Sequence, residues 1–229
     1  MLKILTDAAK SILSGIIPIW LWLLIVTQAG GFLYLYYVDI YGLIDTNLPV
    51  AFFVASACVI LLVWSCWEIS RRLVHSSPIV AGSFSRWIIW LLLFDGLNQF
   101  AWYAPFYIFD DTVAVWLSPI IMAISGAVFL PLLVHSLSFA ANRNHSPQMP
   151  TIFSLQMPIN NLRLGYIIWA VLWHLVDPVT AEWLNRSSDP VDQMTMATVS
   201  TVSNFIFFIG EFAIAAVGYD QLRQSTSHI

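Results

Sequence analysis

The chain is patterned as long apolar runs separated by short polar segments. A helix needs about 20 mostly apolar residues to cross a bilayer, because hydrocarbon offers the backbone no hydrogen-bond partners. Six runs reach that length and predict six membrane-spanning helices: Ile16–Tyr37, Leu48–Cys66, Trp87–Ile108, Val113–Leu137, Leu164–Leu184 and Thr195–Tyr219. The first run is longer than the apolar part of a signal peptide, and no small-residue cleavage site precedes polar sequence, so we interpret it as a true span.

The charged residues between these runs predict how the helices are oriented. Lys and Arg accumulate on cytoplasmic loops, and a six-span arrangement places every cation except Arg186 on one side. The opposite loops carry aspartates. We therefore predict an all-α, polytopic transmembrane bundle with both termini cytoplasmic, formed by residues 1–229 as a single integral membrane domain. The membrane is that of the endoplasmic reticulum or the bacterial inner membrane.

Composition supports a membrane protein and excludes several functions. Hydrophobic residues make up 59% of the chain and charged residues only 10%, against roughly 25% charged in soluble domains. No basic segment is available for nucleic acid, so DNA and RNA are excluded as partners. The only lysines, Lys3 and Lys10, precede the first span, which excludes a retinal Schiff base within a span. Cys58 and Cys66 are two helical turns apart and cannot form a disulfide with each other.

Ionisable residues inside the predicted spans are the candidate functional residues. Each costs at least a few kcal/mol in hydrocarbon, so we expect it to face the interior of the bundle. The candidates are Glu68, Asp95, His135, His174, Asp177 and Glu211. Their predicted depths allow Glu68, Asp95 and Glu211 to share one cavity that faces the cytoplasmic side.

Glu211 is the candidate with the clearest signal. It lies in the otherwise apolar stretch 205–217, where desolvation favours the protonated carboxyl and makes it a candidate acid. The alternative is a structural, hydrogen-bonded glutamic acid. Glu68 precedes Arg71 and Arg72 by three and four residues, so charge pairing at the interface competes with catalysis.

Asp95 and Asn98 lie three residues apart in the most polar stretch inside any predicted span. They therefore share a helix face and can orient a polar substrate group or clamp two helices together.

Two further sets of side chains are candidate ligand-binding groups. His135 and His174 allow a haem-ligation hypothesis, but no His-x-x-x-His or matching second pair supports it, so we predict no cofactor and no metal. Aromatic residues recur at helical spacing within the spans and can surround transient positive charge. The binding residues that we predict are Asn98, Trp64, Trp67, Trp90, Trp173 and Phe208.

Two short motifs resemble the small integral-membrane terpene cyclases of meroterpenoid and indole-diterpene pathways. Trp67-Glu68 resembles the first acidic site of that family, and the segment 207–211 resembles the second, with Glu211 where the family usually has Asp. The segment from Arg163 to Pro190 is similar to the family's penultimate helix and following loop. The resemblance implies seven spans and acid-initiated cyclisation of a polyprenyl substrate.

The leading hypothesis is therefore a membrane-embedded cyclase or isomerase acting on a lipophilic isoprenoid. Glu211 is the expected proton donor, Glu68 a second acid or its partner, and Asp95 with Asn98 an orienting pair. No metal is required, because protonation replaces ionisation of a diphosphate. The alternative is a non-catalytic membrane protein, either a carrier, a proton relay or a subunit of a complex, with haem bound by the two histidines as one variant.

Overall fold

The computed structural model of the chain describes residues 2–13, 17–74, 83–141, 157–175, 179 and 189–226. These residues form seven α-helices and one 3-10 helix, and no strand occurs among them. The helices are α1 (Leu2–Ser11), α2 (Ile19–Ile40), α3 (Ile44–Leu73), α4 (Phe84–Tyr103), η2 (Ala104–Tyr107), α5 (Asp111–Ala140), α7 (Met157–His174) and α9 (Pro190–Thr226). The predicted all-α fold is confirmed.

Four of the described helices are long and apolar enough to cross a membrane. They are Ile19–Ile40, Asn47–Leu73, Asp111–Ala140 and Pro190–Leu222. Helices α4 and α7 do not reach this combination of length and hydropathy, so the six-span count stays a prediction. Asp177, one of the candidate ionisable residues, lies outside the described residues.

Two tight connections set the helix directions. Gly42 adopts a positive φ of 63°, and the N–H groups of Gly42 and Leu43 donate to the carbonyl oxygens of Asp39 (3.0 Å) and Val38 (2.8 Å). This glycine-dependent C-terminal cap ends α2 and turns the chain back into α3. At the start of α5, the Asp110 carboxylate accepts a hydrogen bond from the Val113 N–H at 3.0 Å, which satisfies one free helix donor.

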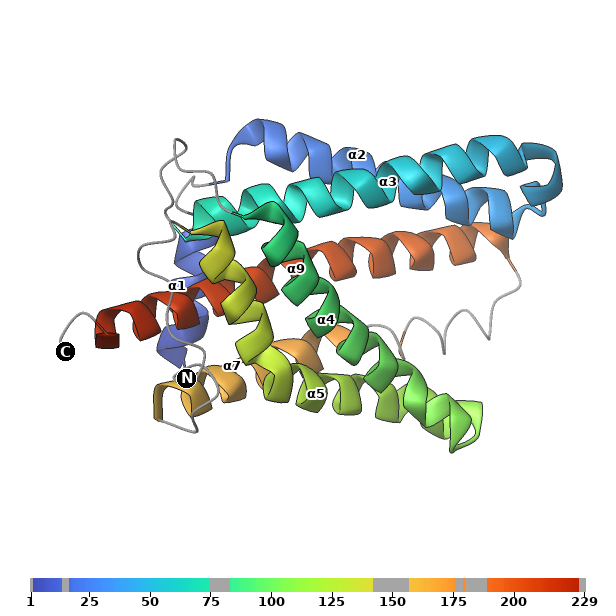
Figure 1. The fold of residues 1–229 in the computed structure, drawn as a ribbon. Coiled ribbons are helices and arrows are strands. Elements are labelled where there is room, and N and C mark those ends of the chain that lie inside the picture. Colours follow the sequence, from blue (N-terminus) through green and yellow to red (C-terminus); the bar gives the residue numbers. More distant parts are fainter. Residues whose placement is uncertain are drawn as a thin grey trace.

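The helices form a wedge (Figure 1). Helices α2 and α3 pack against each other and against α9, whereas α4 packs along α5, and α7 lies between α5 and α9. Helix α4 diverges from α3, and both chain termini lie at the narrow end (Figure 1). At that end, the Trp67 ring packs against Phe84 (5.4 Å between centroids) and Trp87 (5.2 Å). The Trp87 indole N–H also donates to Ser70 Oγ at 3.2 Å.

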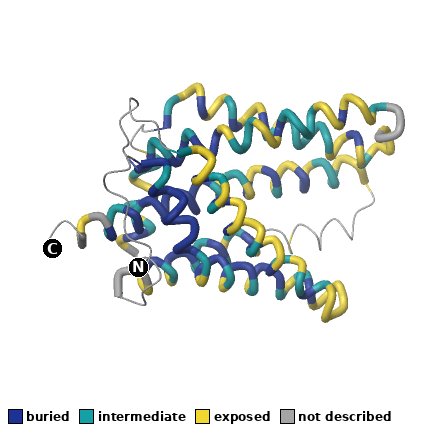
Figure 2. The backbone as a smooth tube through the Cα atoms, viewed as in Figure 1, coloured by how far each residue is buried: buried dark blue, intermediate teal, exposed yellow. Residues whose placement is uncertain are grey.

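Burial is concentrated where α5, α7 and α9 meet, toward the narrow end (Figure 2). Two glycines allow α7 to approach its neighbours closely. A Cβ atom on Gly126 of α5 would overlap the ring and hydroxyl of Tyr166, and one on Gly210 of α9 would overlap the Trp169 indole. Small residues are typical of such contacts between membrane helices. Both aromatic side chains are thereby held close to the middle of α9.

Candidate active and binding site

A cavity of about 940 Å³ lies between the helix pair α2 and α3 and the diverging helix α4. Helices α2 and α3 line one side and α4 lines the other, with α9 running along its length and single residues from α5 and α7 contributing. Its lining runs on α9 from Gln193 to Glu211, which is about 27 Å at the helical rise per residue. The cavity is therefore long enough to hold an extended molecule.

The lining residues occupy one face of each helix, because they recur at steps of three and four. On α4 they are Ile88, Leu91, Leu92, Asp95, Asn98, Gln99, Trp102 and Tyr103. On α9 they are Gln193, Met196, Ala197, Ser200, Asn204, Phe207, Phe208 and Glu211.

Glu211 lies at one end of this α9 face and is only 5% exposed. The hydroxyl of Tyr166, which is fully buried on α7, donates a hydrogen bond to Glu211 Oε1 at 2.5 Å. Among the described residues this is the only hydrogen bond that the Glu211 carboxyl makes. Tyr166 itself lies against the bare backbone of Gly126. Three helices therefore fix the carboxyl and leave its second oxygen without a protein partner in the described part of the chain.

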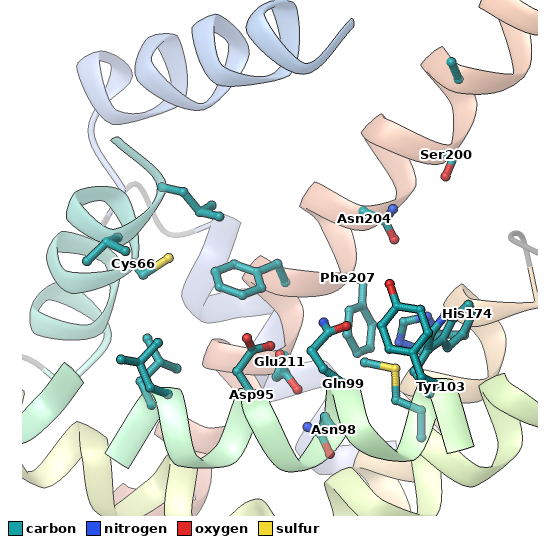
Figure 3. A pocket seen from close by; sticks show the side chains of 18 of the residues that line it. Cys66, Asp95, Asn98, Gln99, Tyr103, His174, Ser200, Asn204, Phe207 and Glu211 are labelled. Atoms are coloured by element: carbon teal, nitrogen blue, oxygen red, sulfur yellow. The ribbon is translucent and has the colours of Figure 1, made fainter. Parts of the chain in front are cut away.

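Asp95 comes from α4 and extends into the same cavity as Glu211 (Figure 3). It is exposed to this space, and the Gln99 side chain one turn along α4 is within hydrogen-bonding reach. No described Lys or Arg forms an ion pair with it. Asn98, also in the lining, is 2% exposed and its Oδ1 has no hydrogen-bond partner among the described residues. The structure therefore brings Asp95, Asn98 and Glu211 together.

Glu68 is not among the residues that line the cavity. Its two carboxylate oxygens lie 3.3 Å from Arg71 Nη1 and 3.8 Å from Arg72 Nε. The expectation of one cavity shared by three carboxyls therefore holds for Asp95 and Glu211, whereas Glu68 lies apart with its cations. The reason is local, because two arginines one turn away along α3 keep the carboxylate paired.

The predicted binding residues separate in the same way. Asn98 and Phe208 line the cavity, and the four tryptophans do not. Trp67 fills the narrow end of the wedge, and the side chain of Trp64 is 51% exposed. Trp90 packs edge-on against His135, with 4.8 Å between the ring centroids. Trp173 packs against Trp169, with 5.1 Å between the ring centroids. The aromatic lining is supplied by the predicted Phe208 together with four other rings, those of Tyr36, Trp102, Tyr103 and Phe207.

The two candidate haem ligands do not face each other. His135 lies between the rings of Trp90 and Phe139, whereas His174 lines the cavity and packs against Trp102 and Phe207. Trp90 and Trp102 are twelve residues apart on α4, which is about 18 Å along the helix. One iron cannot bind both imidazoles in this arrangement. Within the described ranges, no three His, Cys, Asp or Glu side chains group as metal ligands.

Sequence reasoning missed Tyr166 and the polar face of α9. A buried tyrosine inside an apolar span needs a hydrogen-bond partner for its hydroxyl, and this need was the available signal for Tyr166. On α9, the polar residues Gln193, Ser200, Asn204 and Glu211 recur at steps of seven, four and seven. That spacing places them on one helix face and predicts a polar stripe.

Comparison of the chain with protein-family models, curated proteins and solved structures gives no significant match.

Proposed function

We propose that the protein is a membrane enzyme that protonates an uncharged, lipophilic isoprenoid and thereby cyclises or isomerises it. The observation that carries this proposal is the buried carboxyl of Glu211, which lines a large cavity and is hydrogen-bonded there by the Tyr166 hydroxyl. Burial away from cations favours the neutral acid, and a neutral carboxyl is a proton donor. The resemblance of residues 207–211 to membrane terpene cyclases supports the same role.

The proposed reaction needs one acid and one base. Glu211 transfers its Oε2 proton to an epoxide oxygen or alkene carbon, and a neighbouring π bond closes the ring as the C–O or π bond breaks. The resulting carbocation then loses a proton from an adjacent carbon to the Asp95 carboxylate. Product and substrate are isomers; Asp95 then releases the proton it has accepted to solvent, and Glu211 regains one from solvent. Because Glu68 is held by two arginines, we assign the second carboxyl of the reaction, which acts as the base, to Asp95.

The proposed setting is a six-span protein with both termini in the cytoplasm. In this arrangement α4 and α7 are the two further spans beside the four long apolar helices. The narrow end of the wedge, where both termini lie (Figure 1), faces the cytoplasm. The cavity therefore lies within the bilayer, where a lipophilic substrate is already dissolved.

Product analysis tests the proposal directly. The protein, purified in detergent, is incubated with epoxidised farnesyl-bearing aromatic acceptors, and the products are identified by mass spectrometry and NMR. We expect a new product of unchanged mass with wild-type protein and none with Glu211→Gln. Equal product formation by the Glu211→Gln variant would exclude Glu211 as the acid.

A second candidate function, a carrier or proton relay, is favoured by the polar stripe on α9. Gln193, Ser200 and Asn204 extend from the wide end of the wedge to Glu211 on one helix face, as expected for a water-lined path. Proton uptake into proteoliposomes distinguishes the two functions. A carrier acidifies the lumen in a Glu211-dependent manner without altering any isoprenoid, whereas the proposed enzyme does not.

A further inference from the structure

The charges in the cavity are of one sign. Its described lining contains two carboxyl groups, Asp95 and Glu211, and neither Lys nor Arg, so the imidazole of His174 is the only basic group there. A site with low-dielectric walls strengthens the field of its fixed charges. A phosphate or carboxylate ligand would therefore enter without a counter-charge and against repulsion, whereas a cation would supply the positively charged partner that Asp95 lacks among the described residues.

The aromatic rings of the lining suit the same ligand charge. Tyr36, Trp102, Tyr103, Phe207 and Phe208 all border the cavity. The face of an aromatic ring carries negative quadrupole charge and attracts an organic cation, and this attraction increases when the cation is desolvated. Aromatic rings combined with a carboxylate are a recognised way to hold an ammonium group in a water-poor site.

The neutral polar groups of the lining add hydrogen-bond acceptors. Asn98 Oδ1 is buried and has no hydrogen-bond partner in the described part of the chain. A buried carbonyl oxygen left in this state is costly, so a ligand N–H that reached it would recover that cost. Gln99 and Asn204 offer further acceptors from α4 and α9 (Figure 3).

The remaining lining is aliphatic. Leu62 and Val63 of α3 face Ile88, Leu91 and Leu92 of α4 across the cavity. This wall has no polar group to satisfy and suits a hydrocarbon chain. The volume of about 940 Å³ is at the upper end of the range for small-molecule sites, so a charged group and a tail of ten or more carbons fit together.

We propose that this cavity is a binding site for lipophilic organic cations, in which Asp95 and the aromatic rings hold an amine or ammonium group and the aliphatic wall holds its tail. The inference goes beyond the proposed reaction, because it concerns the charge of a ligand that remains bound unchanged. Binding of the cation does not require that Glu211 transfers a proton.

Binding is tested in phosphatidylcholine nanodiscs with three compounds that share one geranyl chain. They are N,N-dimethylgeranylamine, its uncharged hydrocarbon isostere and geranyl diphosphate. Calorimetry against empty nanodiscs corrects for partition into lipid. We expect the amine to bind at least tenfold more tightly than the isostere and the diphosphate not to bind.

Paired variants make the test specific for the charge of Asp95. Asp95→Asn should weaken amine binding at least tenfold and leave the isostere unchanged. The control Asp39→Asn removes an exposed carboxyl outside the lining and should change neither affinity. Three results would overturn the proposal: amine heats no larger than those of empty nanodiscs, diphosphate binding as tight as the amine, or an amine affinity that Asp95→Asn does not change. Because no turnover is measured, these results are independent of the isomerase assay.

Discussion

Glu68 and Glu211 are both carboxyls on long apolar helices, and the structure gives them opposite surroundings. Glu68 lies on α3 with two arginines at 3.3 and 3.8 Å. Glu211 lies on α9 with a tyrosine hydroxyl as its hydrogen-bond partner and a cavity beside it. An ion pair stabilises the charged carboxylate, whereas burial with a neutral donor leaves the acid form favoured. The difference shows that the chemistry of a carboxyl on a long apolar helix is determined by its immediate partners, which lie on the same helix for Glu68 and on α7 for Glu211.

Removing the acid at Glu211 should have the largest effect. Glu211→Gln keeps the shape of the side chain and a group that accepts the Tyr166 hydrogen bond, but it abolishes proton donation. We expect product formation to fall by roughly 10²- to 10⁴-fold, the range for a lost general acid, with an unchanged far-ultraviolet circular dichroism spectrum. The measurement is the initial rate of isomer formation. A loss of similar size in Glu68→Gln would remove the distinction between the two carboxyls.

The sequence predicted the helices better than it predicted the site, for a physical reason. Long apolar runs are a local signal, and α2, α3, α5 and α9 follow from them. Site geometry depends on contacts between helices, such as the one that joins Tyr166 to Glu211.

The aromatic residues show the same limit. Helical spacing identifies which tryptophans share a face but not which neighbour that face meets. Trp67 and Trp90 therefore pack against Trp87 and His135, while Trp102 and Tyr103, which were not among the predicted binding residues, line the cavity. Asp95 and Asn98 were identified correctly as neighbours because their relation lies within one helix.

The next largest effect should come from the helix contact that positions Glu211. Gly126→Ala places a methyl group where the Tyr166 ring and hydroxyl lie, so α7 must move away from α5. Overpacking of this kind typically costs about 1–3 kcal/mol. The measurement is the thermal midpoint in detergent. Gly30→Ala on α2 is the matched control, because nothing lies within 4 Å of its added Cβ, and it should not lower the midpoint. Equal midpoints for both variants would show that α5 and α7 are not in close contact.

Removing the donor to Glu211 should have an intermediate effect on turnover. Tyr166→Phe deletes one hydroxyl and keeps the ring that fills the space beside Gly126. A single hydrogen bond contributes about 0.5–1.5 kcal/mol, which corresponds to roughly a two- to tenfold change in rate. We expect kcat to fall by that amount while KM stays constant, because Tyr166 positions the acid and is not part of the cavity lining. A change in KM alone would instead indicate a role in substrate binding.

The smallest effect should come from Glu68, and it completes the comparison. Glu68→Gln removes a pairing with Arg71 and Arg72, whose side chains are 22% and 35% exposed. Partly exposed ion pairs contribute about 0–1 kcal/mol, and both arginines also pack over the rings of Trp67 and Trp20. These ring contacts remain in the variant.

We expect isomer formation within about twofold of wild type and a thermal midpoint that falls by only a few degrees. Salt should reproduce most of this shift in wild-type protein, because screening weakens the same pair. A midpoint as low as that of Gly126→Ala would mean that Glu68 holds the narrow end of the wedge together, and its charge pairing would then be structural for the whole cavity.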